Sequence, residues 1–303
     1  MIITHEFPLQ FYLNGFAESL TDYDYCLAHR YLNNEKYRDY MKNQVSKGRI
    51  VYLDNSLYEL GKAWNSEEYV DIIKDLNPTY YMLPDMFKNL EKNIESQVNF
   101  YKKYSNLNSK PIIIPHANSL NNPNDNLMLS INKLRDGTNP CAMIALPFAD
   151  YSFENPDNME GYFTEEDIPY IPLRQAYNRK LFLEYHHNEL SNNSIHLLGC
   201  KSLAEFDLWS NDFNKSNIFS LDTSHPVAMT LEDKGLVYSK GLFTPSIGKD
   251  YKREDVCRIY SMHQYKSPYL IDDHFEESFN KYIYEPLKKN IEYFQNCVRT
   301  WSK

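Results

Sequence analysis

The chain has 303 residues, 42% of them hydrophobic and 15% aromatic, and a formal net charge of −9. This length suits one large domain with a substantial core, and the acidic balance argues against binding nucleic acid through overall charge. No apolar stretch is long enough to cross a bilayer, and the first residues lack the basic start and apolar body of a signal peptide. We therefore expect a cytoplasmic protein without membrane contact.

Short apolar runs follow one another along the chain, and each ends in a polar or turn residue. Unbroken β-branched and aromatic residues predict buried parallel strands. In chain order the runs are Arg49–Asp54, Pro78–Asp85, Pro111–His116, Cys141–Pro147, Ser194–Gly199 and Asn217–Asp222. Because α/β enzymes keep their chemistry at the carboxyl ends of such strands, these ends predict one shared site.

The segments between the runs carry apolar residues at three- and four-residue spacing among charges, which predicts helices. The predicted helices are Ser66–Leu76, Phe87–Tyr104, Leu173–Leu190, Ser202–Phe213 and a C-terminal helix from about Glu276 to Trp301.

Alternating strands and helices predict a (β/α)₈ TIM-type barrel that occupies residues 1–303 as a single domain, with its strand-end motifs within residues 50–245. Phe7–Leu13 and Gly235–Phe243 can supply the remaining strands. A doubly wound open sheet is the competing architecture. The barrel is favoured because no Gly-rich dinucleotide turn follows the first strand.

Two of the strand ends carry an aspartate, Asp54 and Asp222. In a closed barrel both open onto one mouth, where one carboxylate can attack a sugar carbon while the other transfers protons. Asp54 could instead only cap a helix or hold a loop. Asp85, after Pro84, could accept hydrogen bonds from a heterocycle edge or simply form a turn, and His116 has a catalytic and a structural interpretation alike.

The main cluster of basic residues contains an aromatic side chain, as a surface that binds a nucleic-acid strand would. A solvated loop is the alternative. The cluster consists of Lys249, Tyr251, Lys252 and Arg253, with Arg258 close by in the sequence.

The cysteines are scattered, without a C-x-x-C pair, which predicts reduced thiols and no metal site. They are Cys26, Cys141, Cys200, Cys257 and Cys297. Asp54, Asp85, Asp222 and His116 could together bind a divalent metal in a barrel hydrolase, but the H-x-H pair typical of many such enzymes is missing.

In order and spacing, the strand ends resemble those of the tRNA-guanine transglycosylases, and most closely their short, often phage-encoded relatives that insert 7-deazaguanines into DNA. The matching segments are Leu53-Asp54-Asn55-Ser56 for T-D-S-G-G-F, Pro84-Asp85, Ile114-Pro115-His116, Ile144-Ala145-Leu146-Pro147, His196-Leu197-Leu198-Gly199 for H-Y-L-M-G, and Leu221-Asp222 with Pro226 for F-D-x-x-x-P.

The resemblance implies that Asp222 is the nucleophile and that Asp54 handles protons. It also implies a substrate pocket for the incoming base, with no cofactor. The residues of this implied pocket are Asn55, Ser56, Tyr58, Asp85, His116, Leu198 and Gly199.

Several departures from the family bear on the substrate. Asn55 and Ser56 replace small turn residues, His116 replaces glutamine, and the Gly-Gly turn is absent, so the base pocket is altered. The family's C-x-C-x-x-C…H zinc site is missing, and the tRNA-docking subdomain that it supports should be missing too. The resemblance therefore implies DNA in preference to tRNA, with free 7-deazaguanine as second substrate, and the host cytoplasm as location if a phage encodes the chain.

Two other classes of function remain open from the sequence. A barrel nucleosidase or glycosyl hydrolase would use the same carboxylates with water. A barrel that has lost catalysis would serve as a nucleic-acid-binding protein, and it need not keep Asp54 and Asp222 facing one pocket.

Overall fold

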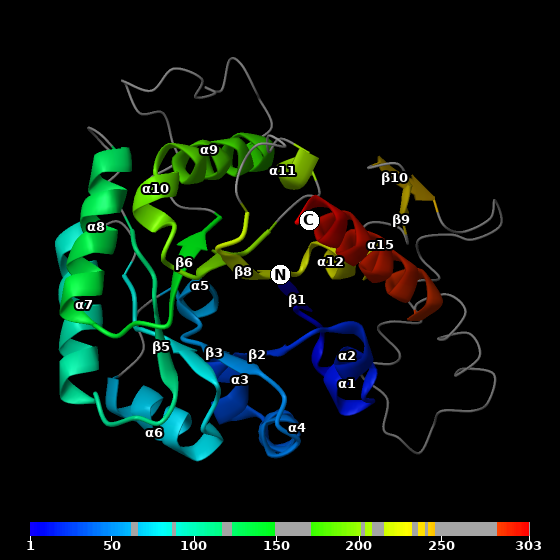
Figure 1. Cartoon of the computed structure of the whole chain (residues 1–303). Coiled ribbons are helices and arrows are strands. Elements are labelled where there is room, and N and C mark those ends of the chain that lie inside the picture. The colour runs from blue at the N-terminus through cyan, green and yellow to red at the C-terminus, as the bar shows by residue number, and fades with distance from the viewer. Residues whose placement is uncertain are drawn as a thin grey trace.

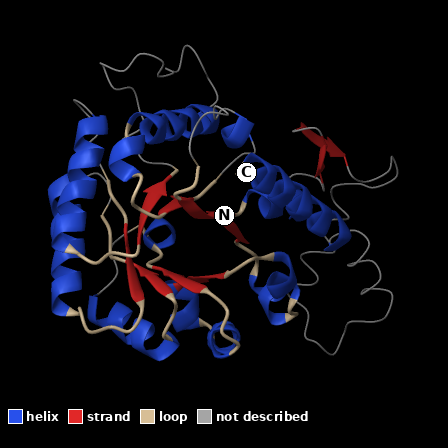
Figure 2. Cartoon of the chain, in the orientation of Figure 1, coloured by secondary structure: helices blue, strands red, loops and turns tan. Residues whose placement is uncertain are grey.

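A computed structural model of the protein describes residues 1–61, 66–86, 89–116, 123–148, 171–200, 204–207, 215–231, 236–239, 242–245 and 284–302. Parallel strands occupy the centre, and helices surround them (Figures 1 and 2). The described part of the chain contains no helix that is both long and apolar enough to span a membrane.

Eight parallel strands form one sheet in the order β1-β8-β7-β6-β5-β4-β3-β2. The strands are β1 (Ile2–His5), β2 (Asp24–Leu27), β3 (Val51–Asp54), β4 (Tyr80–Met82), β5 (Lys110–Ile113), β6 (Met143–Pro147), β7 (Ile195–Leu198) and β8 (Ile218–Thr223). The edge strands β1 and β2 approach each other, since the Asp22 N–H donates to the Ile3 carbonyl at 2.9 Å and Thr4 Oγ1 donates to the Tyr23 carbonyl at 2.7 Å. The sheet is therefore a nearly closed (β/α)₈ barrel, as predicted.

The helices between the strands cover the outside of the barrel. They are α1 (Leu9–Leu13), α2 (Phe16–Leu20), α3 (Ala28–Asn33), α4 (Glu35–Ser46), α5 (Leu57–Leu60), α6 (Ser66–Leu76), α7 (Leu90–Lys103), α8 (Pro123–Gly137), α9 (Ile171–Tyr185), α10 (His187–Leu190), α11 (Ala204–Asp207), α12 (His225–Leu231) and α15 (Glu285–Trp301). The prediction for α6 has the observed bounds. The predicted helix Leu173–Leu190 is divided into α9 and α10, and parts of the last two predicted helices lie outside the described residues.

The two remaining strand predictions are wrong. Most of Phe7–Leu13 forms helix α1, because Phe7, Phe11 and Tyr12 recur at helical spacing and bury one face; the first strand is the preceding Ile2–His5. The described residues of the prediction Gly235–Phe243 do not join the barrel sheet, because β9 (Leu236–Ser239) pairs antiparallel with β10 (Leu242–Pro245) in a separate two-stranded sheet. The second strand, β2, was not predicted.

The core has two layers. Alternate residues of β3 to β6, such as Tyr52, Met82, Ile112 and Met143, pack together inside the barrel, as expected for a closed sheet. The opposite faces pack against the helices. The helix α15 contributes Leu287, Ile291, Phe294 and Val298, which recur on one face and are fully buried.

Candidate active site

The predicted site residues with described surroundings lie at the carboxyl end of the barrel. Asp54 is the last residue of β3, and Asp222 lies near the end of β8, in register with Thr4 of β1. Because all eight strands are parallel, these ends open on the same side. Asn55 and Ser56 also follow β3, and the residues that follow or end other strands at this side are Asp85, His116, Leu198 and Gly199.

Asp54 is held by two donors. The Tyr25 hydroxyl donates to Asp54 Oδ2 at 2.7 Å, and the Ser56 N–H donates to Oδ1 at 2.5 Å. Burial raises the pKa of Asp54 to about 7, and the nearby charge of Glu59 adds to this, while the two hydrogen bonds act in the opposite direction. A carboxyl group with this pKa can both give and take a proton near neutral pH.

Asp222 is nearly fully buried, and two groups contact its Oδ1 oxygen. The Gly199 N–H donates to Asp222 Oδ1 at 2.9 Å, and His196 Nε2 lies 3.0 Å from the same oxygen. The imidazole contact is not aligned as a hydrogen bond, so it is an electrostatic contact. Gly199 has φ +68°, a left-handed conformation that glycine adopts without strain, and this turn brings its N–H to the carboxylate.

The second oxygen of Asp222 has different surroundings. Within the described residues, no hydrogen bond reaches Oδ2. Asp222 therefore has one anchored oxygen and one oxygen that accepts no hydrogen bond from the described residues.

Tyr25 connects the two carboxylates. Its hydroxyl bonds Asp54, and its ring stacks against the His196 ring with centroids 6.5 Å apart and planes at 26°. The charges of Asp54 and Asp222 both raise the pKa of the Tyr25 hydroxyl, after burial as the main cause. The two aspartates thus share one neighbourhood. Sequence analysis missed Tyr25 because it missed β2.

Glu6 is a third carboxyl group of this neighbourhood. It directly follows β1, and its N–H donates to the Thr223 carbonyl at 3.1 Å. Burial raises the pKa of Glu6 to about 8, followed by the charges of Asp222, Glu59 and Asp54. A carboxyl group directly after an apolar strand is a signal that the sequence contains. It was missed because the first strand was predicted at Phe7–Leu13 instead of Ile2–His5.

Asp85 forms a compact cluster with Asn55 and His116. Asn55 Nδ2 donates to Asp85 Oδ1 at 2.8 Å, and His116 Nε2 lies 2.6 Å from Asp85 Oδ2. Asp85 and His116 are almost fully buried. Because both oxygens of Asp85 have protein partners, a base that bound this carboxylate would share it with Asn55 and His116. The role of Asp85 in base recognition stays a prediction.

Arg179 of α9 holds the loop that follows β7, and sequence analysis did not select it. This fully buried side chain donates to three carbonyls and forms an ion pair with the equally buried Glu205, at 2.8 Å from Nε to Oε1. The three carbonyls, at 3.0 to 3.2 Å, belong to Leu146, Leu198 and Gly199.

The peptide between Leu198 and Gly199 consequently joins the Arg179 cation to Asp222. Its carbonyl accepts a hydrogen bond from Arg179, and its N–H donates to the carboxylate. Arg179 thus fixes one of the two groups that contact Asp222 Oδ1.

The other predicted residues lie outside what the structure describes. These are the side chain of Tyr58 and the basic residues Lys249, Tyr251, Lys252 and Arg253. Among the described residues, no group of three or more His, Cys, Asp or Glu side chains has the arrangement of a metal site. The absence of zinc stays a prediction.

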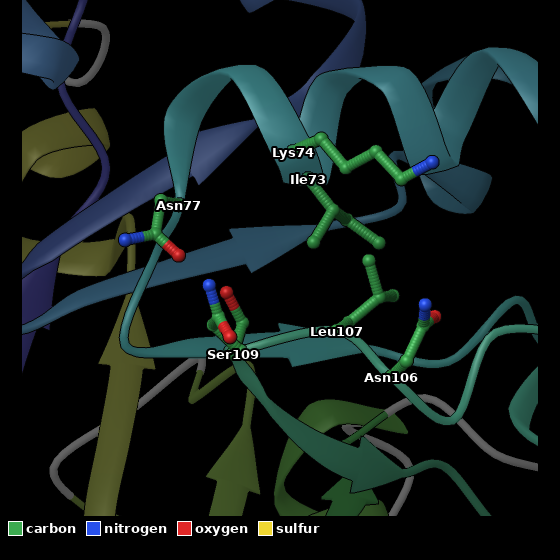
Figure 3. A pocket seen from close by; sticks show the side chains of 7 residues that line it. Ile73, Lys74, Asn77, Asn106, Leu107 and Ser109 are labelled. Carbon is green, nitrogen blue, oxygen red and sulfur yellow. The ribbon is translucent and has the colours of Figure 1, made fainter.

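A hollow of about 360 Å³ lies at the opposite end of the barrel (Figure 3). It is bounded by the end of α6, with Ile73, Lys74 and Asn77, and by residues 106–109, which lead into β5. Since these residues precede a strand, the hollow is separate from the carboxylates at the strand ends.

No protein-family model matches the chain, and no curated protein does. Among solved structures, the chain is similar to a protein from Coccidioides immitis assigned as a fructose-1,6-biphosphate aldolase, at 8% sequence identity and a TM-score of 0.49, over 98% of this chain and 90% of that one. Similarity this distant carries no information on the reaction. The class of the molecule follows from its own strand order, that of a single-domain (β/α)₈ barrel.

Proposed function

We propose that the protein is an enzyme, a base-exchanging transglycosylase that replaces guanine in DNA with a 7-deazaguanine derivative. The observation that carries this proposal is the pair of strand-end carboxylates in unlike surroundings. Asp222 has one oxygen anchored by Gly199 and the other open within the described residues, whereas Asp54 has a pKa of about 7. A nucleophile and a proton-transfer group need these respective properties.

In the first half-reaction, Asp222 attacks C1′ of a deoxyguanosine that has left the base stack. The C1′–N bond breaks, protonated Asp54 gives its proton to the departing guanine, and a covalent glycosyl-enzyme remains. In the second half-reaction, the 7-deazaguanine passes a proton to Asp54, and its nitrogen attacks C1′. The bond to Asp222 breaks, so the carboxylate is restored, and two inversions retain the anomeric configuration.

DNA is the proposed polynucleotide because the sequence lacks the cysteine motif that accompanies tRNA binding in the family it resembles. The net charge of −9 requires that the phosphates be met by a local cluster of basic residues. Lys249, Lys252 and Arg253 are the proposed cluster.

The test is incubation of the protein with DNA and a labelled base. With labelled guanine or 7-deazaguanine, we expect label in the DNA; without free base, we expect a protein–DNA adduct that migrates slowly on a denaturing gel. Asp222→Asn should abolish the adduct and leave folding and DNA affinity nearly intact, because an amide fills the same volume but is a far poorer nucleophile.

Asp75→Asn is the matched control, because Asp75 lies in an exposed ion pair with Lys42. It should leave adduct formation unchanged. Nucleoside analysis separates the competing functions, since a nucleosidase would release guanine without incorporating label. Exchange that survives Asp222→Asn would contradict the proposal, and DNA binding without any adduct would favour a catalytically inactive barrel.

A further inference from the structure

A chain of buried polar side chains runs through the barrel interior to Asp222. The Tyr52 hydroxyl of β3 lies 3.1 Å from Ser220 Oγ of β8, and Ser220 Oγ lies 3.0 Å from His196 Nδ1 of β7. All three residues have no exposed surface. Barrel interiors are usually filled by apolar branched residues, so this polar chain calls for an explanation.

The available hydrogens determine which tautomer His196 adopts. If Tyr52 donates to Ser220, then Ser220 donates to His196 Nδ1, and the imidazole hydrogen sits on Nε2. The reverse order would have Nδ1–H donate to Ser220 and would leave one hydroxyl hydrogen, that of Tyr52 or of Ser220, to the sulfur of Met143, at 3.6 Å or 3.7 Å. A thioether is a weak acceptor, so the first arrangement is favoured.

The same tautomer suits an ionised Asp222. An Nε2–H directed toward Oδ1 attracts a carboxylate, whereas an unprotonated Nε2 at 3.0 Å would repel it. The contact is unaligned in the free protein, and contacts of this kind commonly tighten when substrate binds.

We propose that His196 is a positioning residue for Asp222, held by Ser220 and Tyr52 with a hydrogen on Nε2. With Gly199 it anchors Oδ1, so that Oδ2 faces the sugar carbon. This role rests on the proposed function, because it is defined by the nucleophile. His196 itself does not touch the reacting atoms.

The kinetic test compares two substitutions at this position. His196→Leu removes the N–H and should slow adduct formation at saturating DNA by about 100-fold, the usual cost of a nucleophile displaced by about 1 Å, without changing DNA affinity. His196→Gln restores an N–H donor at similar reach and should recover most of that loss. Equal rates for the two variants, or a Leu variant as fast as the wild type, would overturn the proposal.

His5→Gln provides the matched control for removing a buried imidazole. His5 is as buried as His196, but its ring packs against Phe7 and Phe294 on the outside of the barrel. Its adduct formation should stay within about two-fold of the wild type, while thermal unfolding reports any loss of stability common to both histidine sites.

A second measurement does not depend on activity. In protein labelled with ¹⁵N-histidine, the His196 ring, assigned by its loss in His196→Gln, should show a protonated Nε2 and an unprotonated Nδ1 at pH 8. Ser220→Ala should produce a mixture of tautomers. A hydrogen on Nδ1, or a tautomer indifferent to Ser220→Ala, would overturn the proposal. If the wild type forms no adduct, the proposed function fails, and the NMR result alone decides the role of Ser220 and His196.

Discussion

Asp54 shows how one carboxyl group is tuned by its surroundings. Burial and the charges of Glu59 and Asp85 disfavour its ionised form, and the hydrogen bonds from Tyr25 and Ser56 favour that form. Burial dominates, and the pKa rises from 3.8 to about 7. Near neutral pH, Asp54 is therefore divided between its acid and base forms, which is the condition for efficient proton transfer.

A pH profile of adduct formation tests this role. Because the first half-reaction needs protonated Asp54, the rate at saturating DNA should fall as pH rises above about 7. Asp54→Asn should slow the reaction by a factor on the order of 10²–10⁴, the usual share of general acid–base catalysis, and should remove this decline. A decline that persists in Asp54→Asn would assign the titration to another group, with Glu6 the first candidate.

Asp54 also links stability to pH. Its pKa in the folded state, about 7, lies above its ordinary value of 3.8, so the folded protein binds this proton more tightly than the unfolded chain does. The resulting stabilisation is complete below pH 4 and is lost as pH rises through about 7. When pH is raised from 5 to 8, the free energy of unfolding of Asp54→Asn should therefore increase by about 1–3 kcal/mol relative to that of the wild type, as measured by urea unfolding.

Asp75→Asn is the control for this linkage, because the pKa of Asp75 is shifted in the opposite direction to that of Asp54. The Lys42 ammonium holds the pKa of Asp75 below its ordinary value, so Asp75 is ionised in both folded and unfolded states above pH 5. Its stability change should not vary between pH 5 and pH 8. If the difference in unfolding free energy between Asp54→Asn and the wild type also does not change between pH 5 and pH 8, the raised pKa of Asp54 is contradicted.

At the scale of elements, α9 is joined to the ends of β6 and β7 by a buried charge. Arg179 satisfies the carbonyls of Leu146, Leu198 and Gly199 and is neutralised by Glu205 of α11. The helix packing and the turn that contacts Asp222 therefore depend on one side chain.

Removing this charge should be costly. Arg179→Met leaves Glu205 buried without its cation, so we expect a loss of about 3–5 kcal/mol in the free energy of unfolding. Lys42→Met, which breaks the exposed pair with Asp75, should cost less than about 1 kcal/mol. Urea unfolding of the two variants checks the contrast, and comparable small losses would show that the buried pair contributes little.

At the scale of the whole molecule, the two edge strands of the barrel, β1 and β2, are brought together by contacts of Asp22. The Asp22 carboxylate accepts from the Ile3 N–H at 2.9 Å and from the Arg299 guanidinium of α15 at 2.7 Å. The first strand, the segment before β2 and the C-terminal helix therefore meet at one residue, and the C-terminal end of α15 lies near the N-terminus (Figure 1).

Because Asp22 joins β1 to the segment before β2, we expect replacement of Asp22 to cost more stability than replacement of Arg299. Asp22→Ala leaves the Ile3 N–H without its acceptor and should cost about 1–3 kcal/mol. Arg299→Ala removes only a partly exposed ion pair and should cost less than about 1 kcal/mol. Thermal unfolding of both variants is the measurement. A larger loss for Arg299→Ala would mean that the docking of α15, rather than the hydrogen bond to β1, closes the barrel.

Six of the eight barrel strands and the residues at their ends were predictable from the sequence. A run such as Met143–Pro147 is apolar on both faces, and that pattern is local. The edge strands were not predictable in the same way. Ile2–His5 has only two apolar residues before Thr4 and His5, and Asp24–Leu27 begins with a charged residue that Arg49 neutralises only in the folded chain, at 2.6 Å.

The sequence by itself determined that Asp54 and Asp222 stand at the ends of buried parallel strands, because strand periodicity and strand ends are properties of neighbouring residues. Only the tertiary structure decided the partners of these carboxylates: Tyr25 for Asp54, and Gly199 with His196 for Asp222. A side chain's pKa and orientation depend on burial and on donors that folding brings from other strands. The pairing of β2 with β3 and of β7 with β8 supplies those donors, and no local pattern records them.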